Sequence, residues 1–360
     1  MWLILMKHKA ASPFLSVISI NKSKRNSSVE LYRIVATITV LVVHYNGWFV
    51  GGMPDRLDLS QLSAFRIGQA VIESASCICV NMFLIISGYF GIRFKGSSLL
   101  KICLLLLFIY LPFEFFNACI TGDFRIGNFV SGLFMMSRSG YFVQCYLMLM
   151  FLSPILNAFI EKHGKRILHW TICLALIEAY FGNIRSIDCL GFGYGYSFMH
   201  FLLMYMIARC LYLYKDYLFS IKKVFWVIGY FVCTLLIFVQ YVIGITWSFY
   251  YSNPICIISA ICSFMPFVDC NYNSPIINWI ASSTFGVYII QVTSPAYSYL
   301  VKIDNCLLQT QSYAIYLIAS LGVIIVFFLL SVIYDKICNI FINPIVALYI
   351  LKVDGRYEYL

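Results

Sequence analysis

Two side chains that can do chemistry, Arg33 and His44, are separated by ten residues, none of which is charged. On an α-helix eleven residue steps make about three turns, so both side chains lie on one face, about 16 Å apart along the axis. A histidine inside a membrane helix indicates a functional site, because its burial in lipid is costly. Its imidazole also exchanges a proton near neutral pH. Alternatively, Arg33 marks a membrane edge and His44 is only hydrogen-bonded within a helix bundle.

Glu30 precedes Arg33 by three residues, so a helix that starts nearby brings the carboxylate and the guanidinium together. Ser27 and Ser28 are the candidate N-cap residues for that start. We therefore expect a helix-end ion pair, which would also orient the Arg33 side chain.

A second group of cations, Arg93, Lys95 and Lys101, follows the apolar run that begins at Asn81. Arginine and lysine bind phosphate groups through charge-assisted hydrogen bonds. The same residue types also anchor membrane helices on the cytoplasmic side. The pattern leaves both interpretations open, a phosphate-binding mouth and a set of ordinary anchors.

The elements that position these residues must cross a membrane. Of the 360 residues 62% are hydrophobic and 11% charged, and the mean hydropathy is +0.86, whereas soluble domains carry about 25% charged residues. The formal net charge of +10 comes from cations clustered in short loops, a membrane-protein pattern that argues against nucleic-acid binding. The 14 cysteines are scattered through apolar runs, so we expect neither a metal site nor a disulfide framework.

Ten segments approach the length of about 20 apolar residues that crosses the hydrocarbon core. They are 34–50, 74–90, 102–120, 141–160, 167–181, 198–214, 224–247, 251–268, 276–299 and 313–334. Under this topology 19 of the 25 Lys and Arg residues fall on the side of the N-terminus and 6 on the other side. That split places both termini in the cytoplasm. The sequence therefore predicts an all-α fold, a polytopic transmembrane helical bundle of about ten spans.

The predicted bundle forms one domain, 27–351, between an N-terminal tail, 1–26, and a cytoplasmic tail, 352–360. The N-terminal tail has no clean apolar core followed by a cleavage site, so we interpret it as cytoplasmic or interfacial. The segment 337–351 contains Pro344 and is predicted to lie on the membrane surface after the last span.

Two stretches resemble one family, the integral-membrane acyltransferase family 3, which O-acetylates bacterial surface polysaccharides. They are 25–33 leading to His44, and 81–95 with its Ser-Gly-Tyr-Phe sequence. The family signature is an arginine, ten residues and a histidine at the end of the first helix. Residues 141–146 with 153–157, and residues 283–290, resemble later helices of the same family.

The resemblance implies a ten-helix bundle in the bacterial cytoplasmic (inner) membrane, with an acyl-CoA donor, usually acetyl-CoA, on the cytoplasmic side. It implies that His44 and Arg33 are essential. Many members carry a paired-arginine motif where this chain has Arg93-x-Lys95, and lysine lacks the planar fork of arginine. Relatives often have a histidine where this chain has Gln291.

Together these patterns predict a membrane O-acyltransferase whose acceptor is a hydroxyl of a cell-surface or lipid-linked glycan. Arg33, Arg93 and Lys95 would bind the CoA phosphates, and the pantetheine arm would bring the thioester to His44. His44 would act as general base or carry the acyl group transiently. The alternative is a transporter or flippase for a lipid-linked glycan, without acyl-transfer chemistry. Ten spans with buried polar groups would fit it equally.

Overall fold

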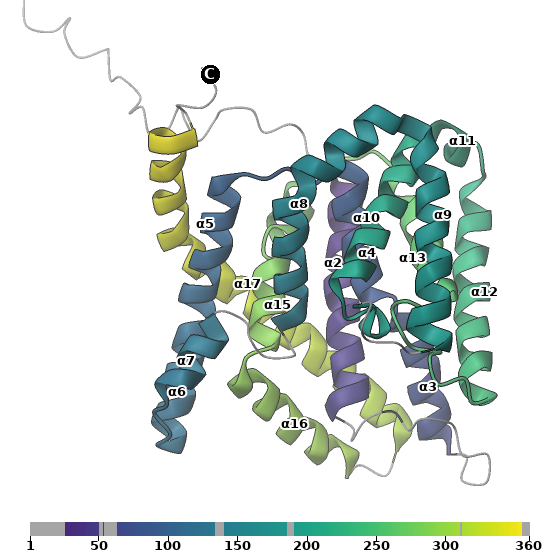
Figure 1. Cartoon of the computed structure of the whole chain (residues 1–360). Helices are drawn as coiled ribbons and strands as arrows, with labels where there is room; N and C mark the ends of the chain where they lie inside the picture. Colours follow the sequence, from purple (N-terminus) through teal and green to yellow (C-terminus); the bar gives the residue numbers. More distant parts are fainter. Residues whose placement is uncertain are drawn as a thin grey trace, which may run out of the picture.

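The computed structural model describes residues 26–49, 53, 63–133, 140–185, 191–309 and 312–354, and its regular secondary structure there is helical (Figure 1). The predicted N-terminal tail, 1–26, lies outside the described residues except for Asn26. Residues 355–360 of the predicted C-terminal tail also lie outside them.

The first half of the chain forms helices that are interrupted by three π-helical turns, η1, η3 and η6. In order they are α2 (Ser27–His44), η1 (Tyr45–Phe49), α3 (Ala64–Ser76), α4 (Cys79–Phe90), α5 (Gly96–Leu105), η3 (Leu106–Tyr110), α6 (Leu111–Thr121), α7 (Ile126–Leu133), α8 (Tyr141–His163), η5 (Gly164–Arg166), α9 (Ile167–Ile177) and η6 (Glu178–Ile184).

The second half is also helical and ends in the longest helix. Its elements are η8 (Gly193–Gly195), α10 (Phe198–Leu213), α11 (Lys215–Phe219), α12 (Lys223–Val242), α13 (Pro254–Val268), α14 (Pro275–Ala281), α15 (Thr284–Gln291), α16 (Ser294–Leu308), α17 (Tyr313–Tyr349) and η9 (Ile350–Asp354).

Within the described residues six helices are long and apolar enough to cross a membrane, or seven if the pair 275–291 and 296–308, bent by 81°, counts as one broken span. Shorter apolar helices, α10 and α13, lie beside them. The chain is therefore a multi-pass membrane protein. Each of the ten segments expected from the sequence overlaps a helix, while the number of spans stays a prediction.

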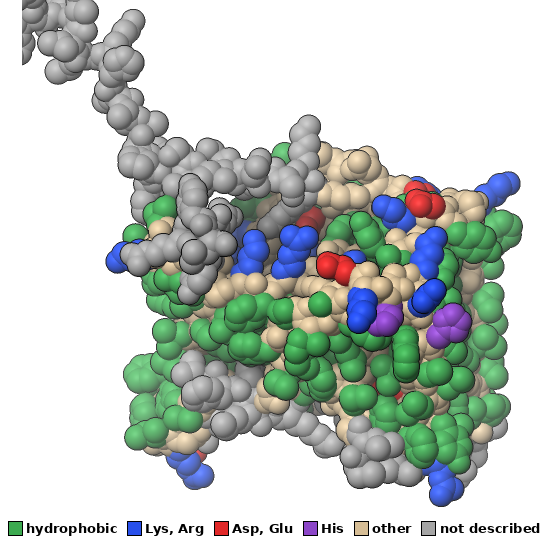
Figure 2. Space-filling model, turned by 45° about the horizontal axis from the view of Figure 1, so that its top comes forward, with side chains coloured by type: hydrophobic (Ala, Val, Ile, Leu, Met, Phe, Trp, Pro, Cys, Tyr) green, Lys and Arg blue, Asp and Glu red, His purple; other side chains and the backbone are tan. Residues whose placement is uncertain are grey.

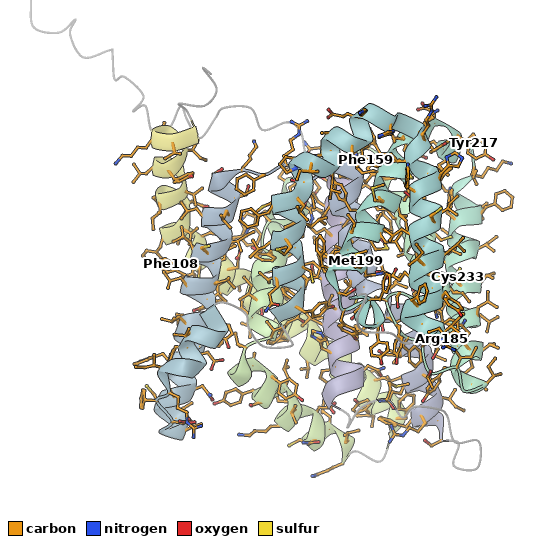
Figure 3. All side chains as sticks on the ribbon, viewed as in Figure 1. Phe108, Phe159, Arg185, Met199, Tyr217 and Cys233 are labelled. Carbon is orange, nitrogen blue, oxygen red and sulfur yellow. The ribbon has the colours of Figure 1, made fainter. Side chains whose placement is uncertain are left out.

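The bundle has two ends with different chemistry. We call the end that carries Arg33, Arg93 and Lys101 the basic end, and Figure 2 shows Lys and Arg side chains gathered over that face. We call the opposite end, where the tyrosines at 141, 194, 196 and 251 meet, the tyrosine end. Figure 3 places Tyr217 toward the basic end and Arg185 toward the other.

Close helix packing brings α4 and α10 together at the centre of the bundle. A Cβ on Gly88 would lie 2.6 Å from the Cβ of Ala208, so only a glycine allows this approach. Small residues at helix contacts of this kind drive packing inside membranes, where the hydrophobic effect is absent. Gly88 belongs to the Ser-Gly-Tyr-Phe sequence, and its position links that motif to the packing of the core.

The last helix differs from the sequence-based expectation. We expected a span ending at residue 334 and a separate surface segment, 337–351, but α17 runs without interruption from Tyr313 to Tyr349 through Pro344. A proline inside a helix removes one backbone hydrogen bond, and membrane helices tolerate this loss when neighbouring groups satisfy the carbonyl. The end of α17 packs beside the start of α5, where a Cβ on Gly96 would meet the Tyr349 ring.

Candidate active site

The first helix, α2, is anchored at its start by a residue other than those expected. Asn26 is the N-cap, and its Oδ1 accepts a hydrogen bond of 3.0 Å from the Ser28 backbone N–H. The prediction of Ser27 or Ser28 as the N-cap was wrong, because both lie inside the helix. Ser27 instead donates its hydroxyl proton to Asn278 Oδ1 at 2.9 Å and so ties α2 to α14.

The predicted ion pair at the start of α2 is confirmed. Arg33 Nη1 lies 2.6 Å from Glu30 Oε2, with 30% of the Arg33 side chain and 8% of the Glu30 side chain exposed. The carboxylate therefore holds the guanidinium at a surface that water still reaches. Such a partly exposed pair contributes about 0–1 kcal/mol to stability, so Arg33 can exchange Glu30 for another anion at a low cost in free energy.

His44 is the last α-helical residue of α2, and η1 begins at the next position, Tyr45. The Tyr45 backbone N–H is shared between the carbonyls of Leu41 and Val42, and the turn that follows is π-helical. Single π-turns inside helices are frequent at functional sites. The Gln291 side chain, from α15, interacts with the His44 ring, and both residues border a void of about 10 Å³.

A single central cavity contains both candidate residues of α2. It has a volume of about 1340 Å³ and is lined by Arg33 and Arg93 at the basic end and by His44 deeper inside. Its middle section is mainly apolar. The residues there include Val40, Val43, Val80, Phe83, Ile86, Ile102, Leu105, Phe142 and Met150.

The predicted cations divide between the cavity and the surface. Arg93 and Lys101 line the central cavity. Lys95 is the residue before α5, at an exposed position, and is not among the described lining residues. The cavity thus joins Arg33, Arg93 and His44, while a role for Lys95 in binding a ligand stays a prediction.

Asp335 of α17 lines the same cavity and was not singled out from the sequence. It is buried, with 2% of its surface exposed. A Cβ on Gly286 would lie 2.1 Å from its Oδ1, so α15 needs a glycine where the carboxylate lies. Asp335 interacts electrostatically with Lys101 and Lys336. The basic end therefore contains a second acid besides Glu30.

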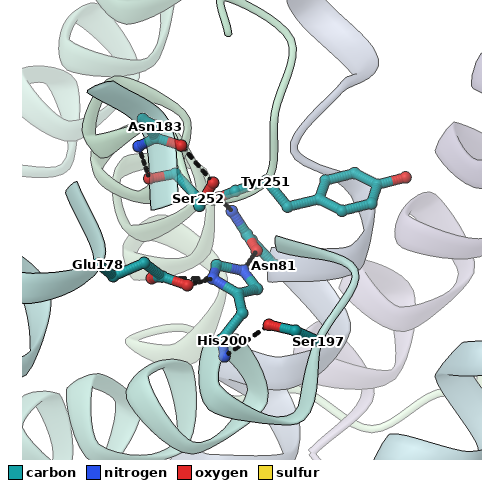
Figure 4. Close-up of polar contacts among 7 residues, drawn as sticks. All are labelled: Asn81, Glu178, Asn183, Ser197, His200, Tyr251 and Ser252. Carbon is teal, nitrogen blue, oxygen red and sulfur yellow. Dashed lines mark hydrogen bonds and ion pairs between the residues drawn. The ribbon is translucent and has the colours of Figure 1, made fainter. Parts of the chain in front are cut away.

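A buried polar network lies near the tyrosine end (Figure 4). Its centre is His200 of α10, which is fully buried between Glu178 and Asn81. His200 Nε2 lies 2.7 Å from Asn81 Oδ1, and His200 Nδ1 lies 3.2 Å from both Glu178 oxygens. Buried polar groups in membranes need such partners, because each one left unsatisfied costs several kcal/mol.

The network fixes its own proton positions. Asn81 Nδ2 donates to the Tyr251 carbonyl at 2.9 Å, so Asn81 Oδ1 must accept, and His200 Nε2 carries a proton. One further proton lies between His200 Nδ1 and the Glu178 carboxyl group. Whichever group holds that proton, the Glu178–His200 pair has no net charge.

A second pair of hydrogen bonds extends the network. Asn183 Nδ2 donates to the Ser252 carbonyl at 2.9 Å, and the Ser252 hydroxyl donates back to Asn183 Oδ1. Residues 251 and 252 are therefore held from two helical segments, α4 through Asn81 and η6 through Asn183. The turn between α12 and α13 is fixed where it borders the central cavity.

At the tyrosine end the central cavity is lined by aromatic side chains. Tyr196 contacts Tyr141 with ring centroids 4.9 Å apart and Tyr251 at 4.8 Å. Tyr194 lines the cavity next to them and adopts a φ of 59°, the left-handed region that non-glycine residues avoid. The two ends of one cavity thus present guanidinium groups and phenol rings.

The sequence analysis assigned no role to Glu178 or His200. They are 22 residues apart, and their partner Asn81 is 119 residues from His200, so no local spacing connects the three. The tyrosine end had a visible signal that we did not use, the alternation of glycine and aromatic residues from Gly191 to Tyr196.

Comparisons with known proteins agree with the extent of the bundle. One protein-family model, described as an acyltransferase domain, matches residues 26–334. No curated protein and no solved structure matches the chain. The matched range contains the complete α2 helix, both groups of lining cations and the buried network.

Proposed function

The chain belongs to the acyltransferase 3 family, and from this membership we propose that it moves an acetyl group from acetyl-CoA to a hydroxyl of a cell-surface or lipid-linked glycan. The observation that carries the proposal is the central cavity, which connects Arg33 and Arg93 to His44. A basic entrance and a deeper imidazole match the two ends of an acyl-CoA, the phosphates and the thioester.

The basic end supports donor binding through its charges. Arg33, Arg93 and Lys101 line the cavity, and guanidinium groups bind phosphates through paired, charge-assisted hydrogen bonds. The Glu30 carboxylate holds Arg33 in place before the donor arrives. We propose Arg33 and Arg93 as phosphate ligands, with Lys101 and Lys95 as further cations near the entrance.

The distance along α2 suits the donor. Arg33 and His44 are eleven residues apart in one uninterrupted helix, which corresponds to about 16 Å. An extended pantetheine arm has a similar length, so phosphates held at Arg33 would place the thioester beside His44. The apolar middle section would surround the arm and exclude water from the thioester.

His44 can promote transfer in either of two ways. As a general base it takes the proton of the acceptor hydroxyl while that oxygen attacks the thioester carbonyl. The C–S bond then breaks, and the imidazolium returns the proton to the CoA thiolate. As an acyl carrier His44 attacks the thioester itself, releases CoA, and passes the acetyl group to the hydroxyl in a second step. Release of CoA without acceptor would identify the second route.

The orientation in the membrane follows from charge. With the basic end in the cytoplasm, as the positive-inside rule requires, the entrance faces the compartment where acetyl-CoA is made. The tyrosine end then faces outward, toward a surface or lipid-linked glycan. We propose the bacterial cytoplasmic membrane as the site of action, with both chain termini on its inner side.

One observation also favours a second function, that of a transporter or flippase for a lipid-linked glycan. The central cavity borders residues of both ends of the bundle, from Arg33 to Tyr196, as a transport path would. The two functions differ in their products. A transferase leaves acetyl esters on the glycan, whereas a transporter changes only the amount of glycan outside.

The proposal is tested by measuring acetyl esters and total surface glycan in cells with and without the gene, and in cells that carry Arg33→Ala. Loss of ester with unchanged glycan export supports the transferase. Loss of the glycan itself would refute it in favour of transport. Incubation of the purified full-length chain with labelled acetyl-CoA, in lipid nanodiscs, measures the transfer directly.

A further inference from the structure

The tyrosine end of the central cavity differs from the rest of its lining in having no charged side chain. The charged residues among the described lining residues are Glu30, Arg33, Arg93, Lys101 and Asp335. All of them belong to the basic half of the bundle, because Asp335 interacts with Lys101. A ligand at the tyrosine end would therefore meet phenol rings and hydroxyl groups, and no fixed charge.

Two of the tyrosines come from a turn whose shape depends on left-handed backbone angles. Gly193, Tyr194 and Gly195 have φ values of 44°, 59° and 87°. A Cβ on Gly195 would lie 2.7 Å from both the Ser252 backbone nitrogen and the Tyr251 Cβ. Strain at a residue such as Tyr194 costs about 1–3 kcal/mol and is found mostly at functional sites. The turn 193–196 packs closely against residues 251–252, and this packing places the Tyr196 ring in contact with the Tyr251 ring.

The partner side of this contact is fixed by the buried network. Asn81 holds the Tyr251 carbonyl, and Asn183 holds Ser252 by two hydrogen bonds. The 251–252 segment is therefore held in place, and residue Tyr196 packs against it while 50% of its surface stays exposed. Tyr196 also lines the central cavity, so its exposed surface borders the space that a ligand would enter, unlike the equally exposed ring of Tyr180, which does not line it.

From this geometry we propose that Tyr194 and Tyr196, supported from behind by the buried Tyr251, form a saccharide subsite at the tyrosine end, in which the acceptor sugar is bound. A pyranose presents a flat face of C–H bonds and a rim of hydroxyl groups. The C–H face packs on an aromatic ring, and the hydroxyl groups form hydrogen bonds to phenol hydroxyls. Tyrosine offers both kinds of contact, because it combines an apolar ring with a polar hydroxyl. The identification of that sugar as the acceptor rests on the proposed function; the binding of a saccharide does not.

The test uses the purified full-length chain in nanodiscs. The probe is the mixture of oligosaccharides obtained from the host's own surface glycan after alkali has removed its esters. Tyr196→Ala should raise the KM for these oligosaccharides, and their Kd, by about tenfold. Tyr196→Phe keeps the ring and should change both by less. The Kd for acetyl-CoA should stay unchanged in both variants.

Two further variants separate ligand binding from folding. Tyr194→Gly removes a ring and at the same time suits the φ of 59°, so it should weaken oligosaccharide binding without lowering thermal stability. Tyr180→Ala is the matched control, because Tyr180 is 49% exposed and does not line the described cavity. Its oligosaccharide affinity should equal that of the unaltered chain.

The outcomes distinguish this proposal from the proposed function. If the unaltered chain binds oligosaccharides but transfers no acetyl group, and Tyr196→Ala abolishes binding, the subsite stands and the transferase does not. If transfer proceeds and the oligosaccharide KM is the same in Tyr196→Ala and Tyr194→Gly, the subsite is refuted and the transferase stands. Binding of choline in place of oligosaccharides would also refute it, since aromatic clusters hold quaternary ammonium ions.

Discussion

The two ends of the central cavity hold their ionisable groups in opposite ways. At the basic end Arg33 is paired with Glu30 while 30% of its side chain is exposed. Near the tyrosine end Glu178 and His200 are paired with 1% and 0% exposed, and Asn81 completes the network. The first pair is in contact with water and can change partners, whereas the second is sealed inside the bundle.

This difference in burial predicts a difference in role. Exchanging Glu30 for a phosphate costs little, because exposed ion pairs contribute about 0–1 kcal/mol. Removing one member of a buried pair costs about 3–5 kcal/mol, because the other member is left without a partner. The basic end is therefore suited to a charged ligand that binds and is released in each cycle. The tyrosine end is suited to holding a fixed shape for a neutral ligand.

The largest effect is expected at His44, between the two ends. His44→Ala should lower transfer by about 10²–10⁴-fold, the usual effect of losing a general base, while the protein level in the membrane stays normal. His44→Gln should be nearly as inactive, because an amide has no useful basicity. Acetyl-ester yield per amount of membrane protein measures both. An active and well-expressed His44→Gln would show that the imidazole is a bundle residue without a catalytic role.

The second-largest effect is expected for the buried pair Glu178–His200. Glu178→Ala should destabilise the protein by about 3–5 kcal/mol, seen as a lower thermal midpoint in nanodiscs. Glu178→Gln should cost much less, because its amide N–H can donate to Nδ1 of a neutral His200. Equal losses in the two variants would contradict this account of the shared proton.

The third effect is expected for the partly exposed pair Arg33–Glu30. Arg33→Ala should weaken acetyl-CoA binding by roughly 1.5–3 kcal/mol, the value of a hydrogen bond to a charged group. The thermal midpoint should hardly move, in contrast to Glu178→Ala. Arg33→Lys should restore part of the affinity, because lysine keeps the charge and loses the planar fork. Unchanged binding of a CoA analogue to Arg33→Ala would leave Arg33 as a topological anchor.

The smallest effect is that of salt, and it compares the two ends in one protein. Raising the ionic strength from about 0.05 to 0.5 M should raise the KM for acetyl-CoA about threefold, because exposed charges are screened. The KM for the saccharide acceptor should stay constant, since its proposed subsite has no charged lining residue. A parallel change in both constants would mean that the two ends do not differ as described.

The sequence predicted the positions of the side chains on α2 better than those at the tyrosine end, for a physical reason. Arg33, Glu30 and His44 lie on one helix, whose period converts spacing into position. The Glu178–His200–Asn81 network depends on how three helices pack, and local periodicity contains no information about that. The same limit applies to Lys95 and Lys101, which flank the start of α5, because only the packing of α5 decides which of them lines the cavity.

The apolar middle section of the central cavity also has an electrical consequence. A water-filled passage between the two ends would conduct protons and dissipate the gradient that powers the cell. Hydrophobic constrictions oppose this by expelling water, and each elementary charge driven across 100 mV releases about 2.3 kcal/mol. Val40, Val43, Val80 and Phe83 line this section, and a lining without polar side chains disfavours a continuous file of water. A polar substitution such as Val80→Ser should make growth sensitive to the external pH even where acetyl transfer continues.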